Sequence, residues 1–394
     1  MMTSLLVPPR AAERSGWPTA AATLTVDHTA FAHNLGVMRR VSGVDVLAVV
    51  KANGFGLGAV PLARTAAASG ATALGVATID EAIALRTAGL TLPILAWLPH
   101  PGADLATALR LQIDIACGTE EMLTAVAATA TVVGVKARVH LEADTGMHRG
   151  GASPLEWPEL CRAAARLERA GTVRVVGVWS HLANPGHPHW SAVANQVDAF
   201  TLALGSAYAS GLQPEHHHIA SSGAALAHPR TRFTLVRAGA GLYGIEPVEG
   251  HEFGLRPVVR VAARIVQVKR VRAGSAVGYG AGHVTQDATT LAVVPFGYAD
   301  GVPRSLANTG EVSVGGIRCR IVGAVSMDQI VVDLGTGPAA AAVAGDEIVL
   351  IGDPQAGEPS LAEVAQWAGT IPQEILTGLG DRFARVHEGA QNVA

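Results

Sequence analysis

The chain has little cysteine, little lysine and few aromatic residues for its 394 residues. Its cysteines, Cys117, Cys161 and Cys319, are odd in number and far apart, which excludes a disulfide framework and a cysteine-based zinc site. A net charge of −3 provides no basic field, so nucleic acid and anionic membrane surfaces are excluded as main partners. No apolar run approaches the ~20 residues of a membrane span. These absences predict a soluble protein of a reducing compartment, the cytoplasm.

The first residues lack the long apolar stretch of a secretion signal. Pro8, Pro9 and Arg10 stand where such a stretch would be needed, and Glu13 and Arg14 follow them. We therefore interpret residues 1–21 as a flexible tail. At roughly 100–200 residues per domain, the remaining length predicts two domains.

Eight short apolar runs alternate with Ala-rich segments of helical length between residues 44 and 240. The runs are rich in Val, Ile and Leu and mostly do not alternate with polar residues, which is typical of parallel strands buried on both faces. One intervening segment opens with Thr78-Ile79-Asp80-Glu81, a capping-box pattern that predicts a helix start. The expected strands are Val44–Val50, Ala73–Ala77, Leu92–Leu98, Ile113–Cys117, Ala137–Leu141, Val175–Trp179, His216–Ala220 and Leu235–Arg237.

This alternation predicts an α/β fold, a (β/α)8 TIM-type barrel over residues 22–256. An open doubly wound sheet is the rival fold, but the Gly-x-Gly-x-x-Gly turn expected after its first strand is absent. From about residue 257 to 394 the chain predicts a mostly-β C-terminal domain, with strands in 258–271, 311–334 and 345–352 and one helix near 360–368. Residues 22–28 are β-like, and we expect them to pair with this second domain.

Polar residues gather where the expected barrel strands end, which is where the active sites of such barrels lie. Lys51, one of only three lysines, ends the first strand. A lysine that emerges from a buried strand is partly desolvated, which lowers its pKa and makes its amine a nucleophile that can form an imine. Ser222, with the small residues at 239–241, offers hydroxyl and amide donors for a phosphate.

Arg237 and His181 end two further strands. A guanidinium cannot shed its charge, so Arg237 inside a barrel end needs partners. Each residue alone has an ordinary alternative: a solvated strand end for Lys51, a simple turn for Ser222 and a hydrogen-bonded core histidine for His181. Together, an imine-forming lysine, a phosphate cradle and an arginine facing a ring predict a pyridoxal phosphate site.

The run His216-His217-His218 has a composition typical of metal ligands. Successive strand residues point to opposite faces, so at most two of these histidines could share an ion. We expect no metal site.

Six blocks along the chain resemble motifs of the alanine racemase family. They are AVVKANGFG (48–56), DTGMHR (144–149), RAGAGLYG (237–244), VGYG (277–280), GYADG (297–301) and SMD (326–328), in the family's order within residues 22–387. The resemblance implies a pyridoxal phosphate barrel joined to a β domain, a homodimer with active sites shared between subunits, and interconversion of L- and D-alanine.

The resemblance also implies residue roles. Lys51 would bind the cofactor and act as the base on one face of the substrate's α-carbon, and Tyr279 of a second copy would be the base on the other. A phenol normally titrates near pH ~10, so Tyr279 would be assisted by His181, itself held by Arg237, which also faces the pyridine nitrogen. The implied cofactor-binding residues are Lys51, Phe55, His181, Ser222, Arg237, Gly239, Ala240 and Gln373. The implied substrate-binding residues are Glu142, Arg149, Tyr298 and Met327.

Four positions depart from the family pattern. Glu142 stands where the family usually has a carbamylated lysine, and we expect its carboxylate to orient Arg149. Phe55 and Gln373 replace tyrosines near the phosphate and the substrate entrance, and Leu57 replaces a histidine. Phe55 and Gln373 keep open a racemase of a larger or different amino acid, such as serine or a secondary-metabolite precursor.

Two functions of another kind compete with a racemase. A non-catalytic barrel that carries pyridoxal phosphate would lack the second domain and would have no use for Tyr279. A decarboxylase of the same general architecture would need carboxylate-binding and cysteine features in the second domain, and the sequence does not contain them. Both are therefore weaker interpretations than a racemase.

Overall fold

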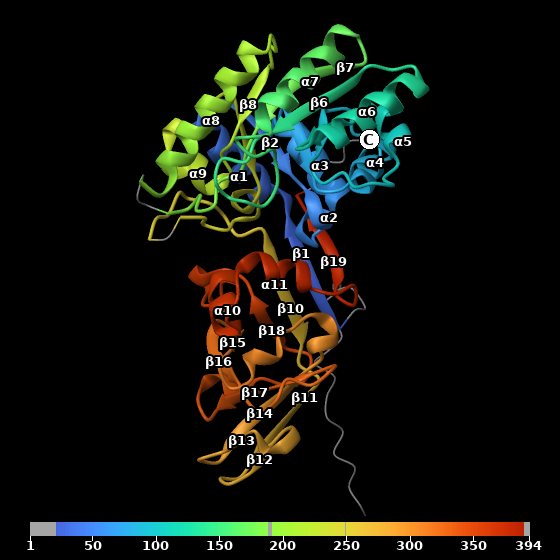
Figure 1. Cartoon of the computed structure of the whole chain (residues 1–394). Coiled ribbons are helices and arrows are strands. Elements are labelled where there is room, and N and C mark those ends of the chain that lie inside the picture. The colour runs from blue at the N-terminus through green and yellow to red at the C-terminus, as the bar shows by residue number, and fades with distance from the viewer. Residues whose placement is uncertain (1–20, 188–190, 249, 390–394) are drawn as a thin grey trace, which may run out of the picture. The chain divides into compact units, whose positions relative to one another are not determined.

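The computed structural model describes residues 21–187, 191–248 and 250–389, so all but the last residue of the expected N-terminal tail lies outside it. The described chain divides into two compact units. Residues 27–258, with 388 and 389, form one unit, and residues 21–26 with 259–387 form the other. The first is a barrel of strands surrounded by helices, and the second is built mainly of strands (Figure 1).

The barrel unit contains eight strands that pair in parallel, so the predicted α/β barrel is confirmed. The order around the sheet is β8-β7-β6-β5-β4-β3-β2-β9. All eight expected runs overlap a strand, because a strand buried on both faces is mostly apolar; β8, which consists of three histidines, is the exception. The strands are β2 (Asp45–Val49), β3 (Ala73–Val76), β4 (Ile94–Ala96), β5 (Asp114–Cys117), β6 (Ala137–Glu142), β7 (Val173–Trp179), β8 (His216–His218) and β9 (Leu235–Ala238).

Closure of the barrel depends on β9. This strand pairs along its length with β2, with Leu235 opposite Asp45 and Ala238 opposite Ala48. On its other side it meets the segment after β8 through an isolated bridge between Ser221 and Arg237 and a backbone hydrogen bond from the Arg237 N–H to the Ala220 carbonyl. The sheet is therefore nearly closed, and the loosest seam lies next to Arg237.

The helices that cover the barrel bury one apolar face each. The capping box predicted at Thr78 is confirmed: its hydroxyl accepts from the Glu81 N–H, and the Glu81 carboxylate accepts from the Thr78 N–H. The helices are α1 (His28–Ser42), α3 (Ala59–Ala68), α4 (Ile79–Thr87), α5 (Leu105–Arg110), α6 (Glu120–Val133), α7 (Trp157–Arg169), α8 (Ser191–Ala209) and α9 (Ser222–Ala227), with 3-10 turns η1 (Pro229–Thr231) and η2 (Ala240–Tyr243).

The segment after β2, α2 (Lys51–Phe55), is an unusual turn. Ala52, Asn53 and Phe55 have φ angles of 52°, 51° and 55°, and Gly54 between them has 62°. A left-handed conformation costs a non-glycine residue about 1–2 kcal/mol. Local strain of this size persists where surrounding contacts enforce it, often at a functional site.

The second unit contains a nine-stranded sheet in the order β11-β14-β17-β16-β15-β18-β10-β1-β19. Residues 22–26 of β1 pair antiparallel with β10, far along the chain. The strands are β1 (Ala22–Asp27), β10 (Val259–Arg264), β11 (Gln267–Val271), β14 (Thr289–Val294), β15 (Glu311–Val314), β16 (Ile317–Ile321), β17 (Ile330–Gly335), β18 (Glu347–Ile351) and β19 (Ala384–Glu388), with a separate pair β12 (Ala276–Val277) and β13 (His283–Val284).

Two helices end this unit where one was expected. The predicted helix is α10 (Leu361–Ala368), and the second is α11 (Pro372–Gly378). The seven residues of α11 are too few to show a helical period. The unit also contains the 3-10 turns η3 (Tyr279–Ala281), η4 (Tyr298–Asp300), η5 (Arg304–Leu306), η6 (Pro338–Ala341) and η7 (Pro354–Ala356).

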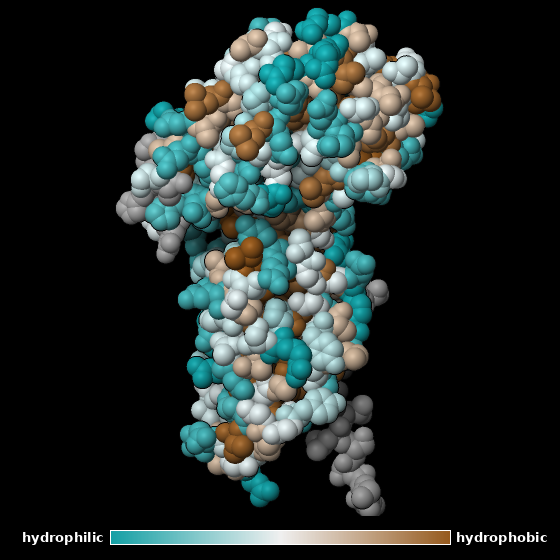
Figure 2. Space-filling model, viewed as in Figure 1, coloured by the Kyte–Doolittle hydropathy of each residue, from teal (hydrophilic) through white to brown (hydrophobic). Residues whose placement is uncertain are grey.

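Within the described residues, no helix has both the length and the apolar character needed to cross a membrane. On the visible face of each unit, apolar side chains are scattered among polar ones (Figure 2).

We expect glycine substitution to stabilise the left-handed turn or leave it unchanged, whereas it destabilises a right-handed helix. Ala52 is exposed, so Ala52→Gly removes no packing and relieves a strained φ, and the thermal midpoint should stay constant or rise. Ala128, exposed inside the right-handed helix α6, is the matched control, and Ala128→Gly should cost about 1 kcal/mol. Equal losses of thermal midpoint in the two variants would contradict the left-handed turn.

Candidate active site

The barrel brings the predicted polar residues together at the C-terminal ends of its strands. Lys51 follows β2, Glu142 ends β6, His181 follows β7, and Arg237 lies in β9. Lys51, Arg149 and Arg237 all act electrostatically on His181, which shows that these four side chains share one region.

The surroundings of the Lys51 amine favour its unprotonated form. Burial lowers the pKa of Lys51, the positive charge of Arg149 lowers it further, and Glu81 opposes the shift. Its ammonium nitrogen lies 5.8 Å from the centre of the Trp97 ring. A lower pKa increases the fraction of unprotonated amine that can attack a carbonyl.

Glu81 also fixes the backbone next to Lys51. One of its carboxylate oxygens accepts from the Ala52 N–H at 2.6 Å, and the other accepts from the Ala77 N–H at 2.9 Å. The turn is closed further by Asn53, whose side-chain oxygen accepts from the Ala59 N–H at 3.0 Å. The sequence marked Glu81 as a helix cap, but its contact with the residue after Lys51 depends on the fold.

Arg237 is 5% exposed and donates to a ring of acceptors. Its Nη1 donates to the carbonyl and to Nδ1 of His218. Its Nη2 faces the carbonyls of Ser180 and Ile219 and Nδ1 of His181, at 2.8, 3.2 and 2.9 Å. Burial lowers the pKa of Arg237 to about 10, so the group stays charged at neutral pH. Its Nε–H has no acceptor among the described residues.

His181 is neutral in this environment. Burial lowers the pKa of His181 to about 3, and the nearby charges of Arg237, Arg149 and Lys51 lower it in the same direction. Because an arginine can only donate, Nδ1 of His181 accepts the bond from Arg237 and the ring proton lies on Nε2. His181 is therefore a hydrogen-bond donor at Nε2.

Ser222, the first residue of α9, organises the turn after β9. Its hydroxyl oxygen accepts from the N–H groups of Gly239 at 2.9 Å and Gly241 at 3.2 Å. The Ser222 proton remains available for an external acceptor, whereas the Gly239 N–H is already used. The Ala240 N–H has no acceptor within the described part of the chain. The candidate phosphate donors are therefore the Ser222 hydroxyl and the Ala240 amide.

Phe55 packs next to the turn at Gly239. It is 7% exposed, and its ring centre lies 4.2 Å from that of Tyr243, whose hydroxyl donates to the Val49 carbonyl at 3.1 Å. Leu57 is fully buried. Both departures from the family pattern are thus accommodated as core residues.

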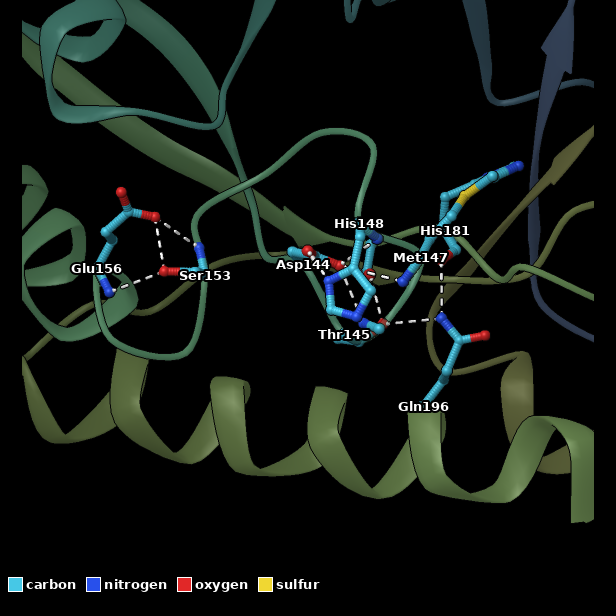
Figure 3. A network of polar contacts seen from close by, with 10 residues as sticks. Asp144, Thr145, Met147, His148, Ser153, Glu156, His181 and Gln196 are labelled. Carbon is cyan, nitrogen blue, oxygen red and sulfur yellow. Dashed lines mark hydrogen bonds and ion pairs between the residues drawn. The ribbon is translucent and has the colours of Figure 1, made fainter.

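The loop after β6 carries Arg149 and is ordered by Asp144 (Figure 3). One Asp144 oxygen accepts from the N–H groups of Gly146, Met147 and His148 at 2.9–3.1 Å. Gln196 of α8 donates to Thr145 and to the His181 carbonyl. This glutamine links the loops after β6 and β7, a role that the sequence analysis missed because the contact crosses the barrel rim.

Glu142 lies against this loop without forming an ion pair to Arg149 within the described ranges. Added Cβ atoms at Gly150 and Gly151 would come within 3.2 Å and 2.9 Å of its side chain, so the glycines make room for the carboxyl. Burial raises the pKa of Glu142 to about 7, although Arg237 and Arg149 favour its charged form. The Glu142 carboxyl therefore titrates near neutrality, because the effect of burial outweighs the attraction of the two guanidinium groups.

Three further predicted residues, Tyr279, Tyr298 and Met327, belong to the second unit. Tyr279 is 80% exposed, Met327 53% and Tyr298 43%. The Tyr298 N–H donates to the Ser326 carbonyl and the Ala299 N–H to the Met327 carbonyl, both at 3.0 Å, which joins two of the motif segments. Arg382 links the same two motif segments through ion pairs to Asp300 and Asp328. The fourth predicted residue, Gln373, is on α11.

The three consecutive histidines point in different directions. His218 is fully buried and bonds to Arg237 and His140, whereas His217 bonds to the Tyr208 hydroxyl. Among the described residues, no group of three or more His, Cys, Asp or Glu side chains is arranged to hold a metal ion.

The Glu142 carboxyl predicts a pH-dependent stability in the cofactor-free protein. Its pKa rises from 4.5 to about 7 on folding, so the folded state binds the proton more tightly. Its contribution to stability is present below about pH 4.5 and is lost as pH rises through about 7. The thermal midpoint of Glu142→Gln, relative to the unmodified chain, should therefore increase from about pH 5 to about pH 8.

Glu121→Gln provides the matched control, because Glu121 is exposed on α6. Its difference in thermal midpoint from the unmodified chain should be independent of pH. A pH-independent difference for Glu142→Gln as well would show that Glu142 is charged throughout this range.

Comparison with known proteins agrees with this geometry. The family model "Alanine racemase, N-terminal domain" matches residues 26–247, and "Alanine racemase, C-terminal domain" matches residues 258–387. The alanine racemase of Salinispora tropica is 44% identical over 93% of this chain and 98% of its own. The crystal structure of alanine racemase from Streptomyces lavendulae matches with a TM-score of 0.92 and 42% identity, covering 95% and 99% of the two chains.

A further solved structure is alanine racemase from Bartonella henselae with covalently bound pyridoxal phosphate. It has a TM-score of 0.85 and 31% identity and covers 94% of this chain and 100% of that one. The matches extend over both units and nearly the full length of each relative. The chain belongs to the alanine racemase family.

Proposed function

We infer that this protein is a pyridoxal phosphate-dependent isomerase that interconverts L- and D-alanine. The observation that carries this conclusion is the partly desolvated Lys51 amine in one barrel end with Arg237 and neutral His181. The family match over both units and the relatives named alanine racemase support the same reaction. Incubation with L-alanine should produce D-alanine until the two are equal.

The residues at the barrel mouth fit the cofactor. A phosphate suits the Ser222 hydroxyl and the Ala240 amide, with Gly239 leaving the turn free of a side chain. The unassigned Nε–H of Arg237 suits the ring nitrogen, and Lys51 supplies the amine for covalent attachment. The indole N–H of Trp179 is buried without a partner among the described residues, a further donor available to a bound group.

When bound, pyridoxal phosphate supplies electron withdrawal that makes the substrate's α-proton removable. Racemisation then needs a base on each face of the α-carbon, because the proton leaves one face and another is added to the opposite face. Lys51 serves as the base on one face, and Tyr279 of a second copy serves on the other. His181 donates from Nε2 toward the phenol oxygen and thereby stabilises the ionised phenol.

The substrate carboxylate binds to Arg149 of one copy and to the Met327 N–H of a second copy, with Tyr298 of that second copy nearby. Within the described ranges, neither the Arg149 side chain nor the Met327 N–H donates a hydrogen bond to another protein group, so both remain available to a carboxylate. Glu142 is close enough to attract Arg149 and acts on its position through the shared glycine loop.

The proposed assembly is a homodimer in which each active site uses residues of both copies. The 80% exposure of Tyr279 in the single chain supports such an arrangement, because it leaves the phenol accessible to a second copy. The three cysteines are buried and free, which supports the proposed cytoplasmic location.

The lysines provide a direct test of the cofactor site. Lys51→Ala should abolish the visible absorbance of covalently bound pyridoxal phosphate and the racemase activity. Lys136→Ala, which removes an exposed lysine next to β6, should change neither. Retained absorbance in Lys51→Ala would assign the attachment to another amine.

Tyr279→Phe tests the second base. The variant should bind the cofactor normally, lose racemisation by ~10²–10⁴-fold, and exchange the α-hydrogen with deuterated water from one alanine enantiomer only. Tyr208→Phe, a change to an exposed tyrosine of the barrel, should leave all three readouts unchanged. Exchange from both enantiomers in Tyr279→Phe would contradict the assignment.

Mixing the inactive Lys51→Ala and Tyr279→Phe proteins tests the shared site. Half of randomly formed dimers contain one copy of each, and one of their two sites then has both bases, so about a quarter of the activity should return. Sites contained within one chain would remain inactive after mixing.

A further inference from the structure

A continuous row of buried polar side chains connects Arg237 with Asp114 through the barrel interior. Arg237 Nη1 donates to His218 Nδ1 at 3.0 Å, and His218 Nε2 lies 2.9 Å from His140 Nδ1. His140 Nε2 lies 3.6 Å from an Asp114 carboxylate oxygen. The four residues are 5%, 0%, 3% and 3% exposed, in this order. Asp114 begins β5, so the row runs from the N-terminal end of the strands toward the active-site end.

The hydrogen bonds allow one arrangement of protons along this row. Arg237 can only donate, so Nδ1 of His218 must accept. The second ring nitrogen of His218 then carries its proton and donates to Nδ1 of His140. The proton of His140 consequently lies on Nε2, facing Asp114. On the other side, the same guanidinium places the His181 proton on Nε2.

The row also stabilises the buried positive charge of Arg237. Arg237 has no ion pair to a carboxylate within the described residues, and its partners are neutral carbonyls and imidazoles. An isolated buried cation is unfavourable unless polar groups around it are oriented to stabilise it. Burial opposes the charge of Asp114, but hydrogen bonds from His140 and Arg138 outweigh this and hold its pKa below the ordinary value. Asp114 thus ends the row with a stable negative charge.

Other charged groups face this row from neighbouring strands and helices. Arg138 of β6 bonds both Asp114 oxygens, at 2.7 and 3.2 Å, and Arg86 of α4 interacts electrostatically with Asp114. His216 stacks on His140 at 6.3 Å between ring centres, and the Glu142 charge acts on Arg237. His216 is a neighbour of the row that forms none of its hydrogen bonds.

We propose that Asp114, His140 and His218 are positioning residues for Arg237 and, through it, for His181. They hold the guanidinium in one orientation and keep His181 as an Nε2–H donor. The catalytic consequence rests on the proposed function: a donor at Nε2 stabilises the ionised phenol of Tyr279, whereas an unprotonated Nε2 would accept from the phenol and keep it neutral.

The first measurement uses cofactor-free protein labelled with ¹⁵N-histidine, because ring-nitrogen shifts report tautomers directly. The His181 signals are assigned by their loss in His181→Asn. In the unmodified chain His181, His218 and His140 should each show the Nε2–H form. His218→Leu should leave His181 as a mixture of tautomers, and His218→Asn, whose amide oxygen can still accept from Arg237, should largely restore the single form.

The second measurement is the pH dependence of kcat/KM in the cofactor-loaded enzyme. In His218→Leu the pH at which the phenol becomes active should rise by about one unit, which is ~tenfold less active base at neutral pH. KM for alanine should change little, because the substrate-binding groups are untouched. His140→Leu and Asp114→Asn should shift the profile in the same direction.

His216→Asn is the matched control, since His216 lies two residues from His218 and contacts His140. It should preserve the His181 tautomer and the pH profile. The proposal is overturned if His181 keeps a single Nε2–H form and the profile stays unchanged in His218→Leu, or if His216→Asn has the same effects. If His218→Leu does not fold, the His140→Leu and Asp114→Asn variants decide by the same two readouts. Absence of racemisation in the unmodified enzyme would instead refute the proposed function, and the tautomer measurement would still stand.

Discussion

A guanidinium that keeps its charge inside the barrel is the constraint around which this active site is organised. Arg237 is almost fully buried, and its two terminal nitrogens, Nη1 and Nη2, donate to carbonyls and imidazoles from the strands and loops next to β9. Because a guanidinium donates in a fixed plane, these partners also determine the orientation and proton positions of their own side chains. His181 obtains its donor role in this way, and burial keeps the imidazole neutral.

The Lys51 side satisfies a different requirement. Its amine has to be partly deprotonated, and burial with a nearby arginine provides this. The backbone beside it is held in a strained left-handed turn by Glu81 and Asn53. Lys51, the proposed nucleophile, is therefore placed by contacts of its turn with α4 and α3, whereas Arg237 is placed mainly by its own hydrogen bonds.

Much of the barrel could be predicted from the sequence because most of its strands, buried on both faces, are rich in apolar residues. The residues at the strand ends were also predictable, since parallel strands place their C-terminal ends at one rim. The left-handed turn was only partly predictable. Asn53-Gly54 is a turn signal, because both residues tolerate a positive φ, but Ala52 ordinarily avoids this conformation and the contact to its N–H comes from Glu81 of a later helix. The role of His218 could not be predicted for a related reason. The sequence does not show which of three adjacent histidines points into the barrel, because this depends on the position of the strand in the closed sheet. The titration of Glu142 near pH 7 depends on burial that no local pattern reveals.

The pairing of β1 with β10 has a consequence for how the protein is made. Thr23 and Ala262, which face each other across these strands, are 239 residues apart. In the finished sheet β1 lies between β10 and β19, and both neighbours leave the ribosome after the whole barrel. The nascent chain therefore carries an unpaired strand while the barrel is being synthesised, and such a strand is a site for aggregation or chaperone binding. β1 can pair with β10 once residues 259–264 have emerged, but its second edge stays open until β19, the last strand of the described chain, has been made.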